Sequence, residues 1–506
     1  MNSSPSPPLP ELLVIDRLEV GPVKLERKRL TAPYTVYRNG EAHSTELIYS
    51  YEEAVFEPGE AGSQNLADMI AAQVALNYGL FCREIVFHGK YDNADRRFLH
   101  SMAENTAREI YVMKLLQPNP FLTGKVAQLK PQAQKHYLNA ELVFPDSASK
   151  SASPSWETDR NRHAILSSGG KDSLLSYGLL NELGREVHSI FGNESGRHWF
   201  TALNAYRHFR DHIPFTGRVW MNSDRVFAWM LRQLPFIRPD FANLRSDEYP
   251  IRLWTVAVFI FGVLPLLRRR GIARVIIGDE YDTTWRAALG NIPHYNGLYD
   301  QSIYFDSALT RYYQQKGWGL TQFSLLRQLS ELLIMTILVK RYPDLQAHQV
   351  SCHASHKEGE RVYPCGKCEK CRRIVGMLSA VDADPTRCGY TPAQIDHCLR
   401  SLAEKGVHQE SAGATHLRWM LAEQARLSLP EKVRKTLRPH PEIVNLRFHP
   451  DRSPAETLPE DLREPLFRIF LEHAEGALER REGKWVPFDP LVQRGGQSAK
   501  GEGRGA

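Results

Sequence analysis

Residues 163–176 read HAILSSGGKDSLLS and bring together residue types that can bind an anion. A strand-like apolar run precedes two glycines, and leucines at helical spacing follow them. A glycine turn at such a junction lets backbone N–H groups approach an anion, and the N-terminus of the following helix adds partial positive charge. Lys171 adds a cation, while Ser168 and Ser173 can donate hydrogen bonds to phosphate oxygens. The stretch therefore predicts a site for a phosphate-bearing ligand.

Asp172 interrupts this cationic pattern, because its carboxylate would repel a bare phosphate. It fits if Mg²⁺ bridges the carboxylate to the phosphates, or if the residue caps the helix. The stretch lacks the GxxxxGK[ST] spacing of the Walker loop. It resembles instead the SGGxDS signature of the PP-loop ATP pyrophosphatases, carried by Ser168, Gly169, Gly170, Lys171, Asp172 and Ser173. A turn that joins strand to helix without binding a ligand is the alternative interpretation.

The PP-loop resemblance implies an AMP-forming reaction with ATP and Mg²⁺ as cofactors. ATP would be cleaved between its α- and β-phosphates, and AMP would pass to a carboxylate or carbonyl oxygen while pyrophosphate leaves. The resemblance places Lys171, Asp172 and Ser173 at the catalytic centre. It also implies that residues 190–194, after the next strand, bind the adenosine part, which includes Asn193 and Glu194.

Four of the seven cysteines are crowded into residues 352–371, at Cys352, Cys365, Cys368 and Cys371. CxxC loops let thiolates reach one tetrahedral ion, and the upstream cysteine completes a four-sulfur shell. Such clustering favours a metal site in a reducing compartment over disulfides. The sequence predicts structural Zn²⁺, its charge offset by nearby basic residues. An iron–sulfur cluster is the alternative, although the CxxCxxCxxxCP run of bacterial ferredoxins is not matched.

The loop and the cysteines together are similar to 7-cyano-7-deazaguanine synthase, a shorter enzyme that adenylates a carboxylate and forms an amide and then a nitrile. The overall plan is closer to the ATP-dependent UDP-N-acetylmuramoyl-L-alanyl-L-glutamate epimerase family. The resemblance spans residues 40–380, with SGGKDS and FSLLRQLSELL (residues 323–333) preceding the cysteines. It implies activation of a small-molecule carboxylate as an acyl-adenylate, followed by epimerisation of an amino-acid or peptide-nucleotide substrate.

Further candidate site residues lie beside predicted strand and helix ends. Asp279, Glu280 and Asp282 end the run VIIGDEYD and are candidates for metal, base or substrate contacts, with capping of the next turn as the alternative. Arg327 and Glu331 of the 323–333 segment are candidate substrate contacts. Two histidines flank SAGAT and are weaker candidates, with a surface helix as the alternative: His408 and His416. The segment around them departs from the epimerase pattern.

Strands and helices alternate after residue 162. The apolar runs predict strands at 164–167, 186–194, 273–280 and 347–352, and helices at 173–184 and 323–342. Alternation of this kind predicts an α/β protein, a parallel sheet with helices on both faces, which agrees with the adenine nucleotide alpha hydrolase-like fold that the resemblance implies. Ligands of such sheets bind beyond the carboxyl ends of the strands, where SSGGKDS, GNES and GDE fall.

The N-terminal region mixes strand-like and helical runs, at residues 45–56, 66–81 and 98–116. A polar loop follows a strand at residues 82–87 and is either a solvated loop or a substrate-recognition loop, through His88, Asp92, Asp95, Arg96 and Arg97.

A chain of 506 residues exceeds one hydrophobic core, so we expect several domains. The predicted divisions are a disordered start (1–12), an N-terminal α+β domain (13–144), a linker (145–161), a PP-loop ATP-binding domain (162–350), a zinc site (351–373), a helical C-terminal region (374–490) and a disordered tail (491–506).

The composition, 42% hydrophobic and 24% charged, is that of a soluble globular protein. The net charge of +6 suits an anionic small ligand and does not require nucleic acid. The apolar window at 253–267 is shorter than the about 20 residues of a membrane span, and the first residues lack the features of a signal peptide. We therefore expect a cytoplasmic enzyme with a small-molecule carboxylate as its partner. A tRNA-modifying PP-loop enzyme and a zinc-dependent binding module with an inactive loop are the alternatives.

Overall fold

The computed structural model describes residues 10–147, 154–194, 196, 198–244, 249–295, 299–407 and 409–492. The outermost parts of the two predicted disordered ends, 1–9 and 493–506, lie outside the described residues, as does His408.

One large mixed sheet of eleven described strands organises the chain. Its order is β13-β10-β7-β8-β9-β4-β3-β1-β5-β6, with β2 beside β3. The strands are β1 (Ile15–Val20), β2 (Lys24–Glu26), β3 (Arg29–Arg38), β4 (Glu41–Tyr51), β5 (Cys82–Phe87), β6 (Glu141–Val143), β7 (Asp159–Ser167), β8 (Glu186–Glu194), β9 (Gly217–Met221), β10 (Ile272–Ile276) and β13 (Thr321–Phe323).

The half of the sheet from β13 to β9 is parallel throughout. Within this half, β7 is the first strand in the sequence. β8 and β9 follow on one side of it, and β10 and β13 lie on its other side. The strand order therefore reverses between β7 and β10, and a doubly wound sheet opens a crevice for ligands at such a point. The prediction of an α/β protein with a largely parallel sheet is confirmed.

Helices cover both faces of this half. Buried side chains of α3, α4 and α8 pack on one face, and those of α6 and α7 belong to the core on the other face together with α1 and α2. The helices are α1 (Ala61–Ala75), α2 (Asn93–Ile110), α3 (Lys171–Glu182), α4 (His198–His212), α5 (Ser223–Arg232), α6 (Val256–Arg270), α7 (Ile303–Gln315), α8 (Glu331–Arg341), α9 (Pro343–Gln346), α10 (Glu369–Ala380), α11 (Pro392–Glu404), α12 (Ser411–Glu423), α13 (Glu431–Arg434) and α14 (Glu460–Leu471).

The N-terminal strands continue the same sheet. β4 pairs antiparallel with β9, with Tyr49 opposite Met221. The Tyr51 hydroxyl donates to the Gly262 carbonyl of α6 at 2.9 Å, so the two segments also share a core. The sequence placed a linker at 145–161, whereas β7 already begins at Asp159. The two segments that the sequence separates are therefore built as one sheet.

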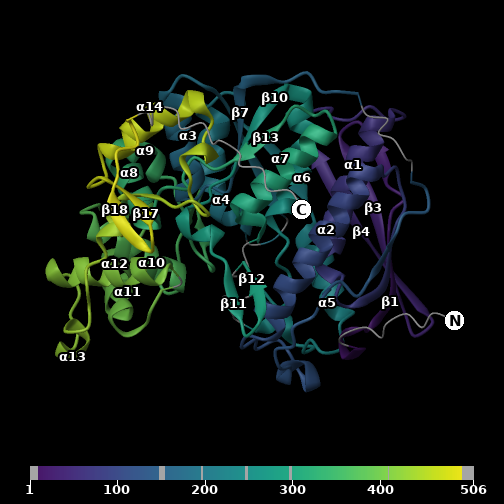
Figure 1. Ribbon diagram of the computed structural model, residues 1–506, viewed down its shortest axis with the longest axis horizontal. Coiled ribbons are helices and arrows are strands. Elements are labelled where there is room, and N and C mark those ends of the chain that lie inside the picture. Colours follow the sequence, from purple (N-terminus) through teal and green to yellow (C-terminus); the bar gives the residue numbers. More distant parts are fainter. Residues whose placement is uncertain are drawn as a thin grey trace, which may run out of the picture.

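The C-terminal elements gather at the opposite end of the molecule from the N-terminal strands (green to yellow against purple in Figure 1). Besides α10 to α14, this region contains a three-stranded sheet of β16 (Leu446–Phe448), β17 (Ala477–Arg481) and β18 (Lys484–Pro487). The purely helical prediction missed these strands, since runs of three to five residues carry little periodicity. Three core aromatics hold the small sheet on α14, Phe448, Phe467 and Phe488.

Two predicted elements before the cysteines are wrong. Residues 347–352 form no strand, and the predicted helix at 323–342 begins at the last residue of β13, continues as a loop and becomes α8 only at Glu331. The reason is the Ser330 side chain, which accepts the Leu333 N–H at 3.0 Å and caps α8 there. Two short hairpins complete the fold, β11 (Ala287–Leu289) with β12 (Ile292–His294) and β14 (His356–Glu358) with β15 (Arg361–Tyr363). Within the described ranges, no helix has both the length and the apolar character needed to cross a bilayer.

Candidate active site and metal centre

The glycine-rich turn joins β7 to α3 at the point where the strand order reverses. Gly169 has a φ of +70°, and a Cβ there would lie 3.1 Å from the Cα of Ala202. Gly170 is the N-cap of α3, and no side chain of the described residues caps this helix. The first N–H groups of α3 therefore have no partner within the helix and are available to an anion.

Asp172 is not the helix cap, since it lies inside the first turn of α3. Its carboxylate lies 2.8 Å from Lys171 Nζ. The end of β10 approaches it closely, because a Cβ on Gly278 would lie 2.6 Å from the Asp172 Cβ. The structure therefore excludes the capping role for Asp172, and its carboxylate lines the cavity beside the glycine turn.

Lys171 is buried among three carboxylates. Its Nζ lies 2.8 Å from Asp172, 3.1 Å from Glu280 and 3.3 Å from Glu331. Burial lowers the pKa of Lys171, but the three carboxylates outweigh this effect and hold its pKa well above the ordinary value. The ammonium is therefore charged at neutral pH and fixed beside the glycine turn.

Glu331 links this lysine to the cysteine-containing segment. Its other oxygen lies 3.5 Å from Arg373 Nη1. Burial would raise the pKa of Glu331, but Lys171 and Arg373 lower it below its ordinary value, so the carboxylate is ionised. Of the two residues that the sequence chose from the 323–333 segment, Glu331 is the one that lines the cavity.

Arg327 has a different environment from the one expected of a substrate contact. It is fully buried, 3.1 Å from Asp279 and 2.5 Å from Asp306, and donates to the hydroxyls of Thr283 and Thr284. Asp279 lines the cavity, and its backbone N–H donates to Ser324 Oγ at 3.1 Å. Arg327 therefore ties β10 to α7 and supports the cavity wall.

Another part of the cavity wall is formed at the end of β8. Glu194 Oε1 lies 3.2 Å from Arg252 Nη1 and accepts from Ser223 Oγ at 2.9 Å. Arg252 is held flat between two aromatic rings, 4.2 Å from the Tyr249 centroid and 4.8 Å from that of Phe227. Side chains alternate along a strand, so Asn193 lies on the other face of β8 and is not in the cavity lining.

The cavity has a volume of about 500 Å³, within the range of small-ligand sites. It is lined from several elements by residues of both charges, by hydroxyls and by apolar side chains. The charged and hydroxyl residues are Ser167, Ser168, Lys171, Asp172, Ser173, Glu194, Thr201, Tyr249, Arg252, Thr255, Asp279, Glu280, Thr283, Glu331, Ser351, Lys370 and Arg373. The sequence pointed to the loop and the acidic residues; the basic residues Arg252, Lys370 and Arg373 were not predicted, since only the fold brings them to the glycine turn.

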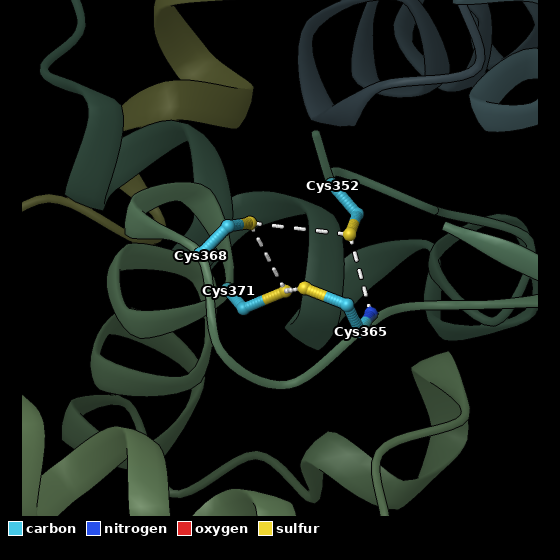
Figure 2. Close-up of side chains that lie close together, drawn as sticks. All are labelled: Cys352, Cys365, Cys368 and Cys371. Atoms are coloured by element: carbon cyan, nitrogen blue, oxygen red, sulfur yellow. Dashed lines mark hydrogen bonds between the residues drawn. The ribbon is translucent and has the colours of Figure 1, made fainter. Parts of the chain in front are cut away.

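The four clustered cysteines point toward one another (Figure 2). Their sulfur atoms lie within 4.8 Å of one another, with pairs at 3.5 and 3.9 Å. A tetrahedral ion about 2.3 Å from each sulfur would separate the sulfurs by about 3.8 Å. The set therefore fits one zinc ion and leaves no room for a cluster of several irons. Backbone N–H groups of Ala354 and Cys365 also donate to Cys352 Sγ, which suits a thiolate.

The cysteines fix the beginning of helix α10. Cys368 is its N-cap and Cys371 lies in its first turn. The same turn carries Lys370 and Arg373 into the cavity, and Cys352 itself lines the cavity wall. The candidate metal centre and the glycine turn therefore border the same space.

The remaining candidates serve the fold. The predicted loop ends at Asp92, which caps α2, so Asp95, Arg96 and Arg97 are helical. Asp92 and Asp95 contact the buried ammonium of Lys316, and neither lines the cavity. His416 is buried and its Nδ1 accepts the His440 N–H at 3.0 Å, so it is not on a surface helix face. Asp282 lies beside the cavity wall, and its burial raises its pKa to about 6.

No protein-family model matches this chain, and a search of curated protein sequences found no match. The functional argument therefore depends on the residues and geometry of the site.

Proposed function

We propose that this protein is an AMP-forming ATP pyrophosphatase that activates a small-molecule carboxylate as an acyl-adenylate. One observation carries the proposal. The uncapped N-terminus of α3 follows a glycine turn at the reversal point of the sheet, and Lys171 is fixed there among Asp172, Glu280 and Glu331. The combination offers N–H donors, a cation and metal-binding carboxylates to one triphosphate.

The residues divide the work along the cavity. The N–H groups of the first turn of α3 and the Lys171 ammonium bind the β- and γ-phosphates. Asp172 and Glu280 are the residues that would hold Mg²⁺, which when bound supplies charge neutralisation at the phosphates. Gly192 and Glu194 line another part of the cavity, where the resemblance to PP-loop enzymes places the adenosine part.

The proposed chemistry is a displacement at the α-phosphorus. A carboxylate oxygen of the substrate forms a bond to this phosphorus, the bond to the bridging oxygen of the β-phosphate breaks, and pyrophosphate leaves with that electron pair. Positive groups placed around the pyrophosphate stabilise the charge that develops on it. The resulting mixed anhydride activates the carboxyl group, and in an amino-acid substrate it also acidifies the neighbouring C–H bond, as an epimerase requires.

The test is to supply ATP, Mg²⁺ and single candidates from a panel of amino-acid and peptide-nucleotide carboxylates. We expect AMP and pyrophosphate in equal amounts, only with a matching acid, and transfer of ¹⁸O from the labelled carboxylate to AMP. Formation of ADP and orthophosphate would contradict the proposal. AMP formation with RNA alone would support a tRNA-modifying enzyme instead.

A further inference from the structure

Two basic side chains of helix α10 line the same cavity as the glycine turn. Lys370 and Arg373 are three positions apart, which places them on one face of the helix. Arg372, between them, points elsewhere and donates to the Gly406 carbonyl at 3.4 Å. Only one face of α10 therefore presents these two basic side chains to the cavity.

The charges of the cavity are not balanced at this wall. Lys171 has three carboxylate partners within 3.3 Å, so its charge is already compensated. Lys370 makes no hydrogen bond or ion pair with any residue that the structure describes, although it is half-buried. The charge of Lys370 interacts with Cys368, Glu369 and Cys352 without a direct contact, so its ammonium can still bind an anion that enters with the ligand.

The contacts of Glu331 indicate which part of a bound ligand Lys370 and Arg373 would contact. Glu331 lies 3.3 Å from Lys171 through one oxygen and 3.5 Å from Arg373 through the other. Arg373 therefore lies one carboxylate away from the lysine that we propose binds phosphate, whereas Arg252 is paired with Glu194 at the end of β8. The anion nearest to α10 would be the terminal phosphates.

We propose that Lys370 and Arg373 form a second wall of a pyrophosphate site and hold the leaving pyrophosphate together with the glycine turn. This inference rests on the proposed function. It gives the cysteine cluster a positioning role, because the cluster fixes the first turn of α10, from which both side chains extend.

The test measures binding of magnesium pyrophosphate and, separately, of AMP by titration calorimetry. We expect Lys370→Gln and Arg373→Ala each to weaken pyrophosphate binding at least tenfold, Arg373→Lys to weaken it less, and all three to leave AMP binding unchanged. The matched controls are Arg372→Ala, on the same helix, and Lys367→Ala, an exposed lysine of the same segment; both should bind pyrophosphate as the wild type does. Zinc content and the melting temperature establish that each variant is folded, and Lys370→Gln keeps the test decisive if Arg373→Ala does not fold.

The failures of the two proposals are distinguishable. If the wild type forms AMP and the folded Lys370 variant binds pyrophosphate normally, the inference is overturned and the proposed function stands. An equal loss of AMP affinity would also overturn it, since the pair would then hold the whole nucleotide. If the wild type binds neither ATP nor pyrophosphate, the proposed function itself fails.

Discussion

Glu331 and Lys171 form an ion pair of 3.3 Å between the first turn of α8 and the first turn of α3. Glu331→Gln keeps the shape of the side chain and removes its charge, so Lys171 is held less firmly and Arg373 loses one of its carboxylate partners. We expect AMP formation to fall about tenfold, the effect of about 1.4 kcal/mol in the barrier. Steady-state rates measure this. Glu182→Gln, which removes a surface partner of Arg341, should leave the rate unchanged.

Asp172 provides the most direct test of the phosphate site. We expect Asp172→Ala to lower AMP formation by a factor of about 10² or more, since a charged group that acts on the transition state is lost. Zinc content and melting temperature should not change, because the residue is partly exposed in the cavity. Asp211→Ala, at an exposed acid of α4, is the control. Undiminished AMP formation in the Asp172 variant would contradict the assignment of the site.

Removal of the metal ligands should disturb both stability and binding. We expect about one zinc ion per chain by elemental analysis, and its loss in Cys365→Ser and Cys368→Ser. The melting temperature should fall, because the cysteines belong to the core formed by α10, α11 and α12. Pyrophosphate binding should weaken in parallel. Cys388→Ala should retain the metal, and a metal-free wild type of equal stability would exclude the structural role.

A substitution of Arg327 tests whether this residue supports the fold or contacts the substrate. Arg327→Met leaves Asp279 and Asp306 as unpaired buried carboxylates, so we expect a loss of about 3–5 kcal/mol in the free energy of unfolding. Urea unfolding measures this. Arg400→Met, at an exposed pair with Asp396, should cost less than about 1 kcal/mol. A higher KM with unchanged stability would instead restore the substrate role.

His416 should make the protein sensitive to mild acid. Burial and the neighbouring His440 lower the pKa of His416 to about 4, whereas an ordinary histidine titrates near about 6.5. The unfolded chain therefore takes up the proton first, and stability present above pH 6.5 is lost as the pH falls toward 4. This loss in the free energy of unfolding amounts to up to about 3 kcal/mol, and we expect it to be absent in His416→Asn. His397→Asn, at an exposed position of α11, is the control.

The sequence predicted those parts of the site whose residues lie close together along the chain. The glycine turn and the CxxC loops act through short spacings, so Lys171, Asp172 and the four cysteines were found directly. Arg252 reaches the cavity from one segment, and Lys370 and Arg373 reach it from α10, more than a hundred residues later; no local pattern marks that meeting. Arg327 shows a related difficulty, since a basic residue next to a predicted site has the same sequence signature whether it binds a ligand or a buried aspartate.

The fold was predictable to a similar depth. Alternating apolar runs indicated most strands of the parallel half, because each run is long and buried. They did not indicate that β4 pairs with β9, since apolar alternation specifies a strand but not its neighbour. The strand predicted at residues 347–352 was wrong, because this short run leads to Cys352 and does not join a sheet.

The pairing of β4 with β9 has a consequence for how the chain can be divided. A fragment that starts at residue 154 would carry β9 with a bare edge, and the hydrogen-bonding groups that Tyr49 and Tyr51 now satisfy would be open to other copies. Such a fragment should aggregate, while co-expression with residues 1–147 should let the two pieces reassemble. The linker predicted at residues 145–161 is thus a poor place to truncate this protein.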